Sequence, residues 1–231
     1  RTVDSAPRPA AREFTDAAIA HSNRDGLLRA SRARWVALAV TAVTLTIINP
    51  NREVIYYILM LGLFALIGWA QLKVGKAGRS RPELFLMFCD LALLTFLSVV
   101  PNPWSAVHWP IGMQFRFDSF IYFFVFLATA TLAYSWRTVI AMGMWTSVLW
   151  IVAVGWAYLQ PETHAALSER VREAVGSDIR MFDFIDPAAI GINARFQQIT
   201  VFLIVAITLA LAVRRSNALL ISHAGIERER T

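Results

Sequence analysis

The sequence predicts an all-α fold: an integral membrane bundle of six transmembrane helices with both termini in the cytoplasm. Three observations predict it. Hydrophobic residues make up 57% and charged residues 16% of the chain, against about 45–50% and about 25% in soluble domains. The apolar residues are concentrated in runs, without helical or strand periodicity across them. Of the 22 Lys and Arg residues, 16 lie on one alternating set of connections between those runs.

The uneven positive charge predicts the orientation. The basic connections are Arg1–Arg34, Lys73–Glu83, the turn around Arg137, and Arg214–Thr231. The positive-inside rule places all four in the cytoplasm. A net charge of +6 and a pI near 10.1 would also suit nucleic-acid binding. Because the basic residues flank apolar runs as membrane anchors do, we exclude nucleic acid as a partner.

The first predicted span, Trp35–Ile48, is short for a bilayer that requires roughly 17–25 residues. It closes on the turn Asn49–Asn51. We expect Arg32 and Arg34 to snorkel toward the interface, so that their aliphatic stems lengthen the span. The alternative is a re-entrant hairpin formed with the second span.

The other five predicted spans are Val54–Leu72, Leu84–Val100, Ser119–Tyr134, Val139–Tyr158 and Ile199–Val213. The transmembrane domain therefore covers Trp35–Val213. Arg1–Arg34 is predicted to be a cytoplasmic tail, and Arg214–Thr231 the start of a cytoplasmic signalling helix.

The longest outer connection is Leu159–Gln198, which mixes acidic residues with Arg. Within it, Glu162–Val175 has the spacing of a short amphipathic helix, and Met181–Ile185 would form an apolar lid on the outer helix ends. Loops of this length usually have a function, but a passive cap over the bundle is the alternative. Pro101–Asp118, rich in Trp and Pro, suits the lipid headgroup region.

Asp90 is the one acidic residue well inside a predicted span. An intramembrane carboxylate is energetically expensive and marks a functional site by default. The alternative is a structural hydrogen bond to a Ser, Thr or Trp on a neighbouring helix. In both cases we expect Asp90 to face the bundle interior.

A second candidate site opens the fourth span. Gln114, Arg116 and Asp118 would form the polar rim of an outward-facing ligand pocket that includes Tyr122. Below the rim, the predicted lining residues are Phe120, Phe123 and Phe124. The simpler interpretation, compatible with the first, is that Asp118 or Ser119 caps the helix N-terminus.

The sequence contains no catalytic constellation. His21, His108, His164 and His223 all lie outside the spans, which disfavours haem held by buried axial ligands. His108 and His164 would supply at most half of a metal site, and Cys89 is the single cysteine. There is no phosphate-binding or dinucleotide-binding glycine motif. We therefore expect no cofactor, no metal and no enzymatic activity in this segment.

Two pairs of small residues favour close helix packing. Gly143 and Ser147 in the fifth span, and Ala206 and Ala210 in the sixth, have the spacing that lets backbones approach. They favour contact between these two spans, within or between subunits.

The last span continues without proline into a charged stretch. Arg214 and Arg215 end the apolar run, and Glu227 and Arg228 belong to a helix-favouring charged segment. A helix that leaves the bilayer in this way can dimerise as a coiled coil. The alternative is a solvated stop-transfer tail.

The order of these features resembles the membrane region of bacterial class III adenylate/guanylate cyclases. The similar segments are Phe117–Phe124 through Trp136-Arg137, and Val213–Arg215 through Ile226–Arg230. The resemblance implies a bacterial inner-membrane protein, multi-pass, with both termini inside. It also implies a homodimer whose cytoplasmic domains, beyond Thr231, make cyclic AMP from ATP with two Mg or Mn ions.

The predicted function is therefore the anchor and ligand-sensing domain of a homodimeric adenylate cyclase. Its partners would be a second copy, membrane lipid, and a lipophilic or periplasmic small molecule. One rival is a small-molecule transporter or channel subunit, which needs a continuous polar path that Asp90 alone would line. The other is the sensor module of a different signalling enzyme.

Overall fold

The computed structural model describes residues 9–48, 51–74, 81–106, 110–117, 119–133, 135–160, 165–176, 185–186 and 188–229, with side chains left out at 9–27, 133, 165 and 220–229. The described chain is helical and contains no strand. In chain order the helices are α1 (Pro9–Ile48), α2 (Glu53–Val74), α3 (Arg81–Val99), α4 (Ile111–Gln114), α5 (Ile121–Ala133), α6 (Trp136–Tyr158), α7 (Ala165–Val175) and α9 (Ile192–Glu229).

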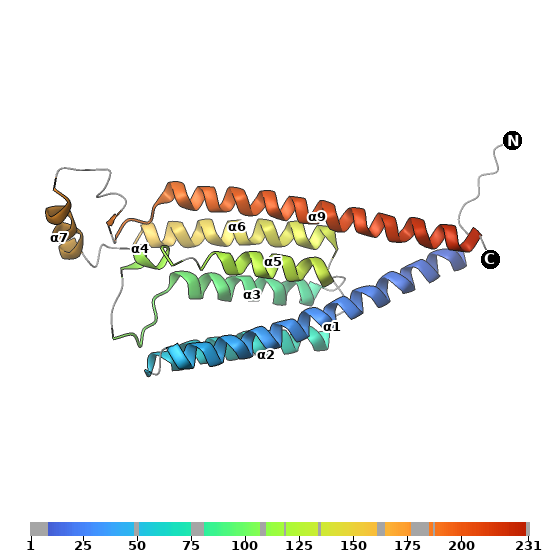
Figure 1. The fold of residues 1–231 in the computed structure, drawn as a ribbon, viewed down its shortest axis with the longest axis horizontal. Coiled ribbons are helices and arrows are strands. Elements are labelled where there is room, and N and C mark those ends of the chain that lie inside the picture. Colours follow the sequence, from blue (N-terminus) through green and yellow to red (C-terminus); the bar gives the residue numbers. More distant parts are fainter. Residues whose placement is uncertain are drawn as a thin grey trace.

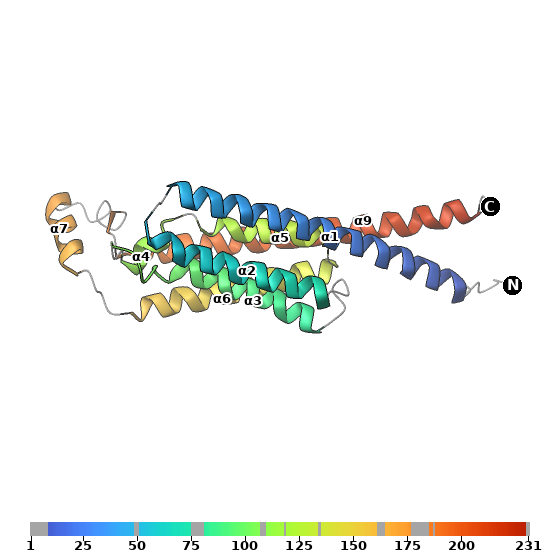
Figure 2. The same cartoon turned by 90° about the horizontal axis from the view of Figure 1, so that it is seen from below.

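The long helices lie lengthwise in one bundle (Figure 1). α1 and α9 both extend beyond the bundle at the same end, which we call the termini end (Figures 1 and 2). The opposite end, which we call the loop end, carries α4 and α7. The described parts of the first and last helices thus project from the same end of the molecule.

Apolar surface dominates the outside of the bundle. Within the described residues, five helices are long and apolar enough to cross a membrane: α1 from Leu28, α2, α3, α6 and α9 up to Leu219. Large side chains such as Ile47 (74% exposed) and Val152 (62% exposed) face outward, an arrangement that requires a lipid solvent. The chain is an all-helical, multi-pass membrane protein. The remaining apolar helix, α5, is shorter, so the sixth crossing stays a prediction.

Two helices begin earlier than the apolar runs predict. α1 is already helical at Pro9, well upstream of the apolar run that begins at Trp35. α9 begins at Ile192, within the predicted outer loop. The span predicted to be short therefore lies within a helix that continues toward the N-terminus.

α6 and α9 form the tightest seam in the bundle. A Cβ added to Gly143 would lie 2.7 Å from the Cβ of Ala206, closer than carbon atoms approach without repulsion. Ala206 and Ala210 are 2% exposed, and Ser147 is also buried. The predicted contact between these spans is confirmed, and it lies within one chain.

Aromatic residues fill the core toward the loop end. The Phe120 ring lies 4.9 Å from Trp150 and 5.5 Å from Phe202, and Phe115 lies 5.5 Å from Trp150. Phe123 and Trp150 are completely buried. Such edge-on pairs stabilise a core beyond the area that they bury. The prediction that Phe120, Phe123 and Phe124 line a ligand pocket is wrong, because they pack against α6 and α9.

Candidate functional site

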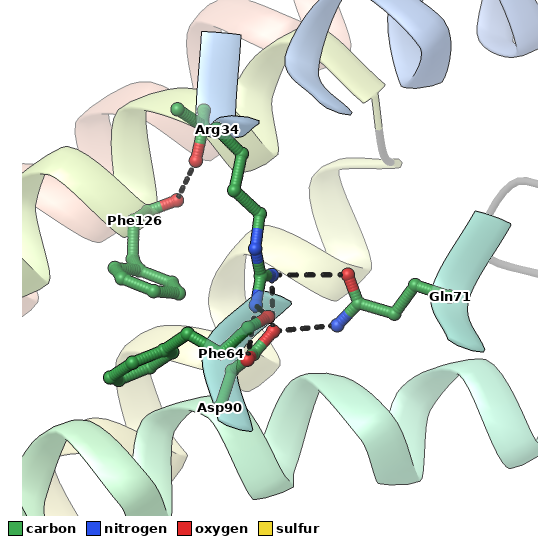
Figure 3. A network of polar contacts seen from close by, with 6 residues as sticks. Arg34, Phe64, Gln71, Asp90 and Phe126 are labelled. Carbon is green, nitrogen blue, oxygen red and sulfur yellow. Dashed lines mark hydrogen bonds and ion pairs between the residues drawn. The ribbon is translucent and has the colours of Figure 1, made fainter. Parts of the chain in front are cut away.

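The most unusual feature of the bundle is a charge pair between α1 and α3, in which the Asp90 side chain is 3% and the Arg34 side chain 19% exposed (Figure 3). Arg34 Nη1 lies 2.6 Å from Asp90 Oδ2, and Nη2 lies 2.7 Å from Oδ1. The pair is therefore bidentate, the strongest arrangement of guanidinium and carboxylate. Asp90 is 2% exposed. The prediction that Asp90 faces the interior is confirmed, but its main partner is an Arg and not a Ser, Thr or Trp.

α2 completes the network. Gln71 Nε2 donates to Asp90 Oδ2 at 2.7 Å, while Gln71 Oε1 accepts from Arg34 Nη1 at 3.3 Å. Arg34 Nη2 also donates to the carbonyl oxygen of Phe64. The Phe126 ring of α5 lies 5.9 Å from the guanidinium carbon. Four helices therefore meet at one guanidinium, and we call Arg34, Gln71 and Asp90 the polar clasp.

Gly68 gives the Arg34 side chain its path across α2. A Cβ at this position would lie 2.9 Å from Arg34 Nε and 3.2 Å from its Cζ. The missing side chain thus lets the guanidinium lie directly on the helix backbone. Any larger residue would require the Arg34 side chain to shift.

The energetics explain why the clasp is so completely paired. A lone charge at this depth would cost several kcal/mol, and removing one member of a buried pair typically costs about 3–5 kcal/mol. With both charges present, the pair is neutral and most of its hydrogen-bonding groups are occupied. The clasp therefore holds α1 against α2 and α3 at the termini end.

A long cavity runs from the clasp toward the loop end. Its volume is about 570 Å³, within the usual range for small-molecule sites of roughly 300–1,000 Å³. α1 forms one wall, from Ala30 to Leu45, and none of its described residues from Leu28 to Ile48 is buried. Most of the remaining lining is apolar, with Leu61 from α2, Leu94 from α3 and Val125 from α5. The cavity thus lies between α1 and the core of the bundle, while α1 also contacts α2 and α5 directly.

Hydroxyl groups gather at the other end of the cavity. Tyr57, Ser119 and Tyr122 line it near the start of α2 and the start of α5. Ser119 Oγ is buried without a hydrogen-bond partner among the described residues. Of the two residues predicted to cap α5, Ser119 therefore does not do so with its side chain, although its carbonyl oxygen accepts from Tyr122 N at 3.1 Å; a cap by the other, Asp118, stays a prediction.

The structure separates the residues predicted to form the second candidate site. Of these, Tyr122 lines the cavity, as does Asp90. Gln114 is half-buried in α4, outside this lining. Arg116 instead binds the outer connection, donating to Ile185 O at 3.2 Å and to Asp186 O. Asp118 lies outside the described residues.

The outer connection is tied down around Asp186. Ser168 of α7 donates to Asp186 Oδ1 at 2.7 Å, so α7 and the α4–α5 connection meet at this residue. α7 itself confirms the amphipathic helix predicted before Val175. Of the predicted lid, the structure describes only Ile185, which is 37% exposed. Residues 181–184, His108 and His164 lie outside the described residues.

At the termini end, α9 carries the predicted exit residues. Arg214 and Arg215 are exposed, and the Arg214 guanidinium lies 5.7 Å from the Trp136 ring centroid. The backbone stays helical through Glu227 and Arg228. The helical continuation predicted for this segment is confirmed over its described length.

Sequence reasoning missed Arg34, Gln71 and Gly68. Arg34 was interpreted as an interfacial residue, because it directly precedes an apolar run. Two signals point to the clasp: Gln71 is a polar residue inside an apolar run, and both it and Asp90 lie near the same predicted end of the bundle. An opposite charge at that level, on Arg34, is the obvious partner for Asp90.

Among the described residues, no group of three or more His, Cys, Asp or Glu side chains is arranged to hold a metal ion. Comparisons with protein-family models, with curated proteins and with solved structures find no match to this chain. The arrangement of its own residues is therefore the only guide to its function.

Proposed function

We propose that this chain is the membrane anchor and ligand-sensing domain of a homodimeric signalling enzyme, with an adenylate cyclase as the expected output. The observation that carries the proposal is α9, which runs as one helix from the bundle core through Arg214 to Glu229. A rigid helix that begins in the core and ends in a charged segment transmits any shift of its packed half to its free half.

The projection of α1 from the same end supports the proposal (Figure 1). α1 and α9 are the two helices that extend beyond the bundle, and they are held in different ways: α9 by close packing against Gly143, α1 by contacts with α2 and α5 and by the polar clasp. A ligand that binds one arrangement of α1 more tightly than another would shift the population between the two. In the proposed dimer, this shift would change how two cytoplasmic domains meet.

A chimera tests the proposal. Arg1–Thr231 is fused to the catalytic domain of a cyclase that is active only as a dimer, and cyclic AMP synthesis is measured in membranes. We expect membrane-bound, dimer-dependent activity well above that of the same domain fused to a single unrelated span. A chimera that reaches the membrane but remains monomeric would contradict the proposal.

A transporter or channel would require a different use of the same residues. The clasp charges are paired with each other, which removes them as free groups along a polar path. Flux of small solutes into liposomes that contain the purified chain would favour that rival over a sensor. Equal flux with and without the protein is the result expected here.

A further inference from the structure

We propose that the cavity beneath α1 is the binding site for a single-chain lipid with an uncharged, hydrogen-bonding head group, such as a monoacylglycerol or fatty alcohol. The head would lie at Tyr57, Ser119 and Tyr122, with the chain extending toward the polar clasp. Binding at this site does not depend on any catalytic output. Only the step from binding to signalling rests on the proposed function.

The shape of the cavity indicates an extended chain. Its α1 wall runs from Ala30 to Leu45, a length of about 22 Å at 1.5 Å per helical residue. A volume of about 570 Å³ spread over that length makes the site long and narrow. The middle section is lined mainly by aliphatic side chains: Leu38, Leu61, Leu94, Leu97 and Val125. An acyl chain matches both the length and the chemistry.

The charges of the cavity favour a neutral head group. Arg34 and Asp90 neutralise each other at its termini end, so a carboxylate or phosphate bound at that end would have to displace Asp90 from a bidentate pair. No other charged side chain lines the cavity within the described residues. A net charge placed there would have no counter-ion, which is costly in a low-dielectric site.

The hydroxyl end supplies the polar recognition. Among the described residues, Ser119 Oγ is buried without a partner. A buried hydroxyl left unpaired is unfavourable, and a ligand hydroxyl or carbonyl would satisfy it. Tyr57 and Tyr122 line the same end of the cavity, so their hydroxyls can donate to the same head group.

Photolabelling of the purified full chain in nanodiscs tests the proposal. The probe is a monoacylglycerol with a diazirine in its acyl chain, and labelled residues are located by mass spectrometry. We expect labels on cavity residues of α1, α2 and α5, competed by unlabelled monoacylglycerol but not by lysophosphatidylglycerol or by the two-chain nanodisc lipid. Labels spread evenly over the lipid-facing surfaces of α6 and α9 would overturn the proposal.

Matched variants separate filling the cavity from perturbing α1. Ala37 lines the cavity, whereas Val36 is 63% exposed on the outside of the same helix. Ala37→Phe should reduce cavity labelling about tenfold, corresponding to about 1.4 kcal/mol, and Val36→Phe should leave it unchanged. Equal loss in both variants, or in neither, would contradict the site.

The head-group end has its own control. Ser119→Ala combined with Tyr122→Phe should weaken monoacylglycerol competition about fivefold, the loss expected for one neutral hydrogen bond. Tyr158→Phe removes a hydroxyl from an exposed position outside the cavity and should have no effect.

A second copy of the chain is the rival occupant. Disulfide-linked dimers of the Ala37→Cys variant in a Cys89→Ser background, formed in place of monoacylglycerol labelling, would overturn the lipid assignment.

Discussion

α9 and α1 both project beyond the termini end of the bundle, yet the bundle holds them by different physical means. Backbone approach at Gly143 and Ala206 and an aromatic core that includes Phe202 hold α9. α1 is attached by the polar clasp at one end, and a long cavity runs along its length. Close packing makes the α6–α9 seam rigid, whereas α1 packs along α2 and α5 without burying any of its described residues from Leu28 to Ile48. The difference makes α1 the helix that a ligand can move.

Removing one charge of the clasp tests most severely whether the charge pair holds α1. Asp90→Leu leaves the partly buried Arg34 guanidinium without its counter-ion, and should lower the free energy of unfolding by about 3 kcal/mol, the low end for a buried pair. The double variant Arg34→Met/Asp90→Leu should recover most of this loss, because no buried charge remains. SDS titration or thermal unfolding in bicelles measures both. A single variant as stable as wild type would show that the pair does not hold α1.

The close packing of the α6–α9 seam is tested at Gly143. An added methyl group would lie 2.7 Å from Ala206 Cβ, so Gly143→Ala should destabilise the fold by about 1–3 kcal/mol through overpacking. Gly155 lies on the same helix with nothing within 4 Å of the corresponding position. Gly155→Ala should therefore be neutral or stabilising by up to about 1 kcal/mol. If the two substitutions had equal effects, the seam would not be close-packed.

Gly68 tests whether the space left on α2 matters because Arg34 occupies it. Gly68→Ala should cost about 1 kcal/mol, at the low end for overpacking, because the atoms that it meets belong to the flexible Arg34 side chain. In an Arg34→Met background the cost should disappear. Gly62→Ala, on the same helix in open space, is the control. A penalty that persists without Arg34 would assign Gly68 a role independent of the clasp.

The smallest expected effect lies at the loop end. Arg116 is exposed and donates to the carbonyl oxygens of Ile185 and Asp186. Arg116→Gln should change global stability by less than about 1 kcal/mol, as exposed polar contacts do, but should speed hydrogen exchange around residues 188–190. Arg170→Gln, on exposed α7, should leave that exchange unchanged. Unaltered exchange in both variants would show that Arg116 does not hold the outer connection.

The sequence predicted the helical class, most helix positions and the α6–α9 contact, because apolar runs and small-residue spacing are local patterns. It also placed Asp90 in the interior, since a lone carboxylate in lipid is too costly. It did not predict the partner of Asp90: Arg34 is distant in sequence, and the helix that presents it extends well upstream of its apolar run. The pocket predicted around Phe120 is wrong, because apolar residues that line a cavity and apolar residues that fill a core have the same sequence pattern.

The distance between the projecting parts of α1 and α9 tests the central claim most directly. Spin labels at Arg29→Cys and Ser216→Cys, both exposed, in a Cys89→Ser background would report it by double electron–electron resonance in nanodiscs. A label pair at Met144 and Ile204 across the α6–α9 seam is the internal reference. We predict that Asp90→Ala broadens or shifts the α1–α9 distribution and leaves the reference pair unchanged. An unchanged α1–α9 distribution, or an equal change in both pairs, would contradict the view that the clasp holds a movable α1 against a rigid bundle.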